Sequence, residues 1–154
     1  MPEHDHTIHD LIELRLRHGE LRYTSGRRAI VDCLHDAGQP VSISDIAARV
    51  PSVPRSSAYR HLVDLQRVGV VRRVAANDEF ARFELAEDLT EHHHHLLCTT
   101  CGEVLDVTPT PAFEQVVADM VEQLARSEGF TAVAHTLDVL GTCRACAANL
   151  SPAR

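Results

Sequence analysis

The sequence predicts an α+β chain of two domains, and three features of the chain support this fold class. Residues 1–86 contain a helix, a proline-bearing turn, a second helix and two strand-like runs, which together are the pattern of a winged helix. Residues 87–91 are acidic and lack an apolar period, so we expect a linker there. Residues 92–154 mix strands with one amphipathic helix and contain two C-x2-C pairs, so we expect a separate α/β domain.

Apolar residues at helical spacing predict two helices near the N-terminus. Residues 7–18 place such side chains on one face, and Gly19 ends the run. A second helix begins near Ser25 and ends at Gly38. Cys33 lies on the apolar face of this second helix, so we expect it to be a small core residue.

A helix-turn-helix follows these two helices. Either Ser42 or Ser44 can cap a short helix, and two prolines bracket the turn after it. The next helix opens at Ser56 and ends at Gly69. Two strand-like runs, 70–74 and 80–85, then form the wing, with the hairpin turn at Asn77, Asp78 and Glu79.

In a winged helix the second helix of the helix-turn-helix enters the major groove of DNA, and its first residues meet the bases. An arginine there can reach guanine edges or phosphate, and a tyrosine can pack on thymine methyl groups. The candidate DNA contacts on this helix are Arg55, Ser57, Tyr59 and Arg60. The alternative is that Tyr59 is a core aromatic and that the module packs against protein.

Charge is distributed unevenly along the chain, whose net charge is −7. Residues 1–86 hold twelve arginines and twelve acidic residues, whereas residues 87–154 hold three arginines and ten acidic residues. Five arginines lie between Arg55 and Arg73, against the single acid Asp64. Such a patch can attract phosphates in spite of the net charge, although a solvated arginine face is an equal alternative.

The chain is expected to be cytoplasmic, with no membrane partner. It has no apolar run of about 18 residues, which a membrane span requires. Its N-terminus is acidic and rich in histidine, unlike a secretory signal. His4, His6 and His9 in this segment are either a loose metal-capturing arm or part of a disordered tail.

The second domain is expected to be built around a cysteine knuckle at 98–102. Strands at 96–97 and 103–107 flank it, an amphipathic helix starts after Pro111, and a last strand covers 132–140. Paired cysteines in a reducing compartment indicate a metal site. Four thiolates satisfy the tetrahedral preference of zinc and leave no open position, so we expect a structural site. Its ligands are Cys98, Cys101, Cys143 and Cys146.

Four consecutive histidines, 92–95, precede the knuckle. In an extended segment successive side chains alternate between two faces, which gives two separate H-x-H pairs, each able to chelate one ion. Each pair needs further ligands from elsewhere in the chain. The two candidate sets are His92, His94, Glu114 and His135 on one face, and Glu84, His93, His95 and Asp106 on the other. A lone strand histidine such as His135 could instead be a satisfied core residue.

These residues and their order resemble the ferric uptake regulator family over roughly residues 20–147. The matching stretches are Ser57-Ala58-Tyr59-Arg60, Phe83-Glu84-Leu85, His92–His95, Cys98–Gly102, His135-Thr136 and Gly141-Thr142-Cys143. The resemblance implies a winged helix-turn-helix DNA-binding domain joined to a C-terminal dimerisation domain with a four-cysteine site for structural Zn²⁺. It also implies a homodimer that binds an inverted-repeat operator in double-stranded DNA.

The resemblance also assigns roles to the candidate site residues. The His92 set corresponds to a regulatory metal site, and the Glu84 set to a hinge site at the junction of the domains. Arg22 corresponds to a basic residue near the minor groove, and Tyr59 and Arg60 to the major-groove helix. The sequence departs from the family at Gln39-Pro40, where iron and peroxide sensors supply a histidine. The hinge site is therefore either incomplete or borrows an acid such as Asp88.

The donor types predict which metal the chain senses. His94 stands where iron-responsive members often have aspartate, and a nitrogen-rich site suits zinc or nickel better than iron. The ending HT-x4-GTC resembles the zinc uptake regulator branch. We therefore expect a zinc-responsive transcriptional repressor of metal homeostasis, with Fe²⁺, Ni²⁺, Mn²⁺ or peroxide as alternative signals.

Two alternatives belong to other functional classes. A zinc hydrolase would use an open site, but the sequence has no H-E-x-x-H motif and no separate base, so we do not expect an enzyme. A zinc buffer would bind metal and show no affinity for an operator.

Overall fold

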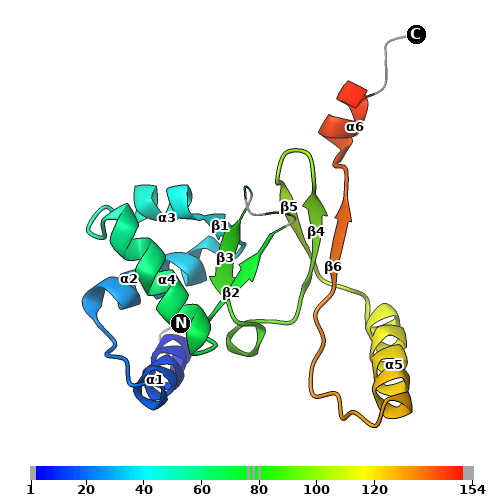
Figure 1. Ribbon diagram of the computed structural model, residues 1–154, viewed down its shortest axis with the longest axis horizontal. Helices are drawn as coiled ribbons and strands as arrows, with labels where there is room; N and C mark the ends of the chain where they lie inside the picture. The colour runs from blue at the N-terminus through cyan, green and yellow to red at the C-terminus, as the bar shows by residue number, and fades with distance from the viewer. Residues whose placement is uncertain (1–2, 76, 78, 80, 151–154) are drawn as a thin grey trace. The chain divides into compact units, whose positions relative to one another are not determined.

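The computed structural model describes residues 3–75, 77, 79 and 81–150 (Figure 1). The chain divides into two units, Met1–Glu91 and His92–Arg154, each with its own three-stranded sheet. The α+β fold class predicted from the sequence is confirmed. None of the helices in the described part of the chain is long and apolar enough to cross a membrane.

The first unit is a winged helix, as the sequence predicted (Figure 1). Its elements are α1 (Glu3–His18), α2 (Ser25–Ala37), β1 (Val41–Ser42), α3 (Ile43–Arg49), α4 (Arg55–Arg67), β2 (Val71–Val74), β3 (Arg82–Leu85) and the short 3-10 helix η2 (Glu87–Leu89). The sheet is antiparallel, in the order β1-β3-β2. Of the predicted wing residues, Asp78 and Phe80 lie outside the described residues, and the second wing strand begins at Arg82.

Apolar side chains from helices α1 to α4 form the core of this unit. Ile12, Ile30, Ile46 and Leu62 are fully buried, one from each helix. Cys33 is 8% exposed and packs in the same core, which confirms the prediction for it. Burial raises the pKa of its thiol, so Cys33 is a structural residue and a poor nucleophile.

Arg15 of α1 joins three parts of this unit. Its guanidinium donates to the backbone carbonyl of Gly69 at 2.5 Å and forms an ion pair with Asp88 of η2. Gly69 follows Val68, the C-cap of α4, and has a φ of 72°, a backbone conformation that glycine adopts at little cost. The segment predicted to be a linker thus begins with a helical turn, and Leu89 of that turn packs against the core.

The second unit contains β4 (His94–Cys98), β5 (Val104–Val107), α5 (Pro111–Ser127), β6 (Asp138–Gly141) and α6 (Arg144–Leu150). Its sheet has the order β5-β4-β6, with β4 antiparallel to β5 and parallel to β6 (Figure 1). The hydroxyl of Thr110 caps α5, and Pro111 occupies its first turn, where a missing N–H costs nothing.

The last predicted strand, 132–140, was wrong for residues 132–137. The strand begins only at Asp138, and residues 130–137 have no regular secondary structure. Val133 is 96% exposed, so the β-branched residues of this segment have no sheet surface on which to pack. Helix α6 was not predicted from the sequence.

The second unit leaves an unusual amount of apolar surface exposed. Helix α5 alone exposes Phe113, Val116, Met120 and Leu124. In the described part of this unit only Leu97, Cys98 and Ala125 are buried apolar residues. Contiguous apolar exposure of this kind is typical of a subunit interface.

Ser42, one of the two predicted caps, is the residue that caps α3. Its hydroxyl accepts from the N–H of Asp45 at 3.2 Å, and the Asp45 carboxylate accepts from the Ser42 N–H at 3.0 Å. Hydrogen bonds from the Ser42 hydroxyl and N–H hold the pKa of Asp45 below its ordinary value.

We expect Ser42→Ala to lower the free energy of unfolding by about 1 kcal/mol at neutral pH, because it removes this cap. A carboxyl group whose pKa is depressed on folding stabilises the fold fully above its unfolded pKa of about 3.9, and this stabilisation is lost as pH falls through the folded pKa. The difference in unfolding free energy between the variant and the wild type should therefore become smaller at low pH. Urea denaturation from neutral pH down to about pH 2 measures both effects. Exposed Ser44 provides the control variant, Ser44→Ala, and an equal loss in both variants would contradict the assignment.

Candidate metal centres and nucleic-acid interface

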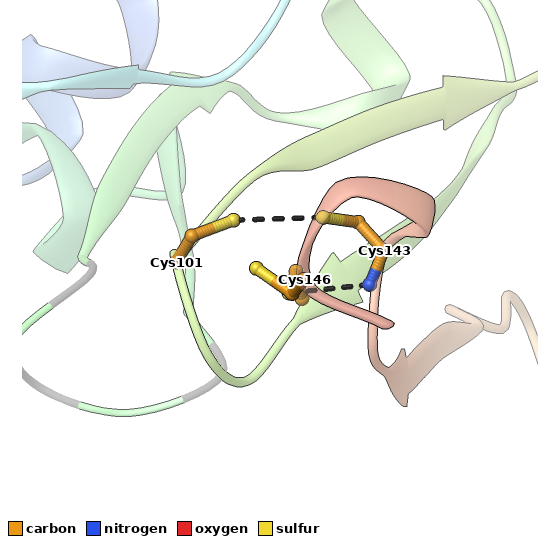
Figure 2. A group of neighbouring side chains, drawn as sticks. Cys101, Cys143 and Cys146 are labelled. Carbon is orange, nitrogen blue, oxygen red and sulfur yellow. Dashed lines mark hydrogen bonds between the residues drawn. The ribbon is translucent and has the colours of Figure 1, made fainter. Parts of the chain in front are cut away.

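The four paired cysteines come together at one end of the second sheet. Cys98 ends β4, Cys101 lies in the turn before β5, Cys143 follows β6, and Cys146 lies in α6. All four are free thiols, and their sulfur atoms lie within 4.8 Å of one another. Figure 2 shows three of them, with the sulfur of Cys101 facing that of Cys143 at 3.8 Å. Two sulfurs that bind one tetrahedral zinc, each at about 2.3 Å, lie about 3.8 Å apart. The distance between the sulfurs of Cys101 and Cys143 therefore fits this ion.

Strand pairing brings the two halves of the cluster together. The parallel register of β4 and β6 sets Cys98 opposite Gly141, two residues before Cys143. Gly102, with a φ of 74°, allows the tight turn that follows Cys101.

The thiol pKa values also fit a cation at this cluster. Backbone N–H groups of Cys143 and Cys101 donate to the sulfur of Cys98 and lower its pKa to about 6. The neighbouring thiols of Cys143 and Cys101 raise the pKa of Cys146 to about 12. The thiol of Cys98 therefore ionises readily, whereas that of Cys146 would need a nearby cation to ionise at neutral pH.

The first histidine set surrounds a single carboxylate. The Nε2 atoms of His92, His94 and His135 lie 3.1, 3.0 and 2.9 Å from the two oxygens of Glu114. The four candidate ligand atoms all lie within 4.8 Å of one another. His94 begins β4 and His92 lies two residues before it, Glu114 is in α5, and His135 is in the irregular segment before β6. The structure thus brings together all four residues predicted for this set, although His135 does not lie on a strand.

This set fits a divalent cation better than a hydrogen-bond network. The Nε2 atom of His135 is buried and has no hydrogen-bond partner among the described residues, despite its short distance to Glu114. Burial opposes ionisation of Glu114, but hydrogen bonds from His94 and the charge of His92 outweigh it and hold the pKa low. Glu114 is therefore an anion at neutral pH, facing three imidazole nitrogens. Three nitrogens and one oxygen are a donor set that zinc accepts.

The second histidine set is centred on His95, whose side chain is fully buried. Its Nδ1 lies 2.9 Å from Asp138, its Nε2 lies 3.7 Å from Asp106, and its ring centroid is 4.9 Å from that of His93. Three members of the predicted set thus lie close together. Asp138 was not among the predicted residues, because its position beside His95 depends on the register of β6.

The remaining predicted hinge ligand, Glu84, belongs to the first unit. It is buried on β3, and Nε of Arg72 donates to its carboxylate at 2.9 Å. Its participation in a site with the histidines therefore stays a prediction. Asp88, the substitute predicted for the missing histidine, forms its ion pair with Arg15 within the same unit.

The predicted DNA contacts of α4 lie at its N-terminal end. Arg55, Tyr59 and Arg60 are exposed and Ser57 is half-buried. Tyr59 is 58% exposed, so the alternative that it is a core aromatic is wrong. The buried residues Ala58, Leu62 and Leu65 hold the opposite face of the helix against the core, which leaves the arginine-rich face accessible.

Buried Arg27 connects α4 to the segment that carries Arg22. Arg22 is exposed before α2, and its carbonyl accepts from Nη1 of Arg27 at 2.6 Å. Nη2 of the same guanidinium pairs with Asp64 of α4 at 2.5 Å. One side chain thus links two elements with predicted DNA contacts. The sequence carries only a weak signal for this link, since Asp64 is the single acid within the arginine cluster.

The N-terminal histidines divide into two groups. His9 lies on α1, with Nδ1 2.6 Å from the hydroxyl of Tyr23 and Nε2 3.1 Å from Asp32. It is therefore a packed residue, and the expectation of a disordered tail was wrong for it. The side chains of His4 and His6 lie outside the described residues.

Comparison with known proteins gives consistent matches. A model described as the ferric uptake regulator family matches residues 18–140. The peroxide operon regulator of Bacillus subtilis is 27% identical over 146 residues, which cover 92% of this chain and 94% of that protein. The structure of the Helicobacter pylori ferric uptake regulator, at 20% identity and a TM-score of 0.71, covers 96% of this chain and 95% of its own and shows a common fold. The ferric uptake regulator of Pseudomonas aeruginosa, solved with manganese, is 26% identical at a TM-score of 0.65, covering 84% of this chain and 95% of its own.

We expect Asp64→Ala to lower the free energy of unfolding by about 1–3 kcal/mol, because it leaves the buried guanidinium of Arg27 without its charged partner. Urea denaturation measures the change. Asp36→Ala removes the same charge from an exposed site of α2 and is the matched control. Equal stability of the two variants would show that the Arg27–Asp64 pair does not hold α4 in place.

Proposed function

The chain belongs to the ferric uptake regulator family, and from this premise we propose that it is a zinc-responsive transcriptional repressor. Members of this family are metal-responsive regulators of transcription that bind DNA and form dimers. We propose that this chain acts as a homodimer on an inverted-repeat operator, and in the cytoplasm, where bacterial DNA is found. The proposed DNA contacts are Arg22, Arg55, Ser57, Tyr59 and Arg60.

The observation that carries the zinc assignment is the donor set around Glu114. Three imidazoles and one carboxylate converge there, and an aspartate at position 94 would have replaced one nitrogen by oxygen. Imidazole-rich sites suit zinc and nickel, whereas oxygen-rich sites suit manganese and magnesium. The proposed ligands of the sensed ion are therefore His92, His94, Glu114 and His135, with the Cys98 cluster as the separate structural zinc site.

The side chains of the Glu114 set join three segments that are distant in the sequence. His94 is in β4, Glu114 is in the first turn of α5, and His135 is in the irregular segment before β6. A divalent cation bound by the three imidazoles and the carboxylate would hold these segments together. Metal can alter operator affinity only through its preference for the DNA-binding conformation, and such coupling is typically about 1–3 kcal/mol.

A peroxide-responsive repressor is the second candidate. The observation in its favour is that relatives at 26–27% identity carry the names peroxide-responsive repressor and peroxide operon regulator. Such a function needs iron and predicts metal-dependent oxidation of a ligand histidine, visible as added oxygen by mass spectrometry. We favour zinc because three nitrogens and one oxygen complete its tetrahedral preference, whereas non-heme iron sites typically keep coordination positions open. An enzyme or a zinc buffer would have no use for the exposed arginine face of α4.

We expect buffered zinc to tighten binding to operator DNA by about 5- to 150-fold, and His94→Ala to abolish this gain. Fluorescence anisotropy measures it, with duplexes from the promoter regions around the chain's own gene and with zinc, iron(II), manganese and nickel buffered in turn. His35→Ala removes an exposed histidine outside the site and should respond like the wild type. Equal binding by the metal-free and zinc-loaded protein would refute the proposal, and tightening by another metal alone would reassign the sensed ion.

For the structural site, Cys101→Ser should remove one bound zinc per chain and lower the melting temperature, because binding to such a site contributes directly to folding. Native mass spectrometry counts the metal, and calorimetry follows unfolding. Cys33→Ala, which removes the one thiol outside the cluster, should keep the zinc. An unchanged zinc count in Cys101→Ser would rule out the four-cysteine site.

A further inference from the structure

Strand register places a carboxylate on each side of His95. His95 lies on the central strand β4, paired with Asp106 of antiparallel β5 and with Asp138 of parallel β6. Residues directly opposite in neighbouring strands have side chains on the same face of the sheet. The three side chains therefore form one row across the sheet, with the fully buried imidazole in the middle.

The two ring nitrogens of His95 face different partners. Nδ1 lies 2.9 Å from Oδ1 of Asp138, which is hydrogen-bond distance, whereas Nε2 lies 3.7 Å from Oδ1 of Asp106, which is too long for one. An ionised carboxylate only accepts, so the proton of this hydrogen bond belongs to Nδ1. In a neutral imidazole the lone pair is then on Nε2.

We propose that Asp138 is a positioning residue that fixes the tautomer and orientation of His95, so that Nε2 is presented as a ligand atom beside His93 and Asp106. This inference rests on the proposed metal-sensing function, which it deepens by adding a residue that the sequence analysis did not find. Asp138 acts at the opposite edge of the ring from Nε2, so it supports the ligand without itself being one.

The chemistry of metal-binding histidines supports this role. A histidine that binds a metal almost always donates its other ring N–H to a carboxylate, carbonyl or water, and removing that partner typically costs about 10–100-fold in metal affinity. The Glu114 set is built differently, because there the carboxylate lies among the Nε2 atoms. Asp138 therefore has an outer supporting role, whereas Glu114 lies among the candidate ligand atoms of its own set.

The test compares Asp138→Ala, Asp138→Asn and the wild type in the full-length chain. Long-range ¹H–¹⁵N correlation spectra of the metal-free protein report which nitrogen of His95 carries the proton. Zinc affinity is measured by competition with a chromophoric chelator in a Glu114→Ala background, which removes the carboxylate of the other set. Asp119→Ala, at an exposed position of α5, is the control for loss of one negative charge in the same unit.

We expect Asp138→Ala to lose the Nδ1–H tautomer as the dominant form and to bind zinc about 10–100-fold more weakly. Asp138→Asn should keep the tautomer and most of the affinity, because its amide oxygen still accepts from Nδ1–H. An unchanged tautomer and affinity in Asp138→Ala would overturn the proposal, as would an equal loss in Asp119→Ala. The tautomer is read without metal or DNA, so a failure of zinc-dependent operator binding would be recognised separately.

Discussion

The parallel pairing of β4 with β6 is the constraint on which the second unit depends. This register places Gly141 beside Cys98, so the chain delivers Cys143 and Cys146 to the first cysteine pair. The same register places Asp138 beside His95. A slip by one residue would move the side chains of β6 to the opposite face of the sheet, and both arrangements would be lost together. A metal bound by the cysteine cluster would therefore also secure the position of Asp138.

The first unit depends on a different interaction, the buried guanidinium of Arg27. The apolar core fixes which face of α4 is buried, but apolar packing alone tolerates small rotations and shifts. The hydrogen bond to Arg22 and the ion pair with Asp64 are directional, and they fix the segment before α2 relative to α4. Two surfaces with predicted roles in DNA binding thus share one internal support.

Local patterns in the sequence were sufficient for helices α1 to α5, the wing and the cysteine cluster, because periodicity, capping residues and C-x2-C spacing act over a few residues. Alternation along 92–95 also separated the histidines correctly, with His94 near Glu114 and His95 near Asp106. Asp138 and Arg27 could not be found in this way, because their roles depend on contacts between distant segments. The irregular path of 130–137 was missed because its β-branched residues suggested a strand, although the strand pairing with β4 begins only at Asp138.

Because the four histidines alternate between two faces, a change in the number of residues in the tract has a larger effect than a change in one residue type. A substitution in the tract changes one ligand of one set. Deleting one histidine would instead shift the others by one position, so that side chains that faced Glu114 would face Asp106, and the reverse. Divergence among related chains can therefore exchange the residue types of this tract, and with them the preferred metal, far more readily than it can change the number of residues.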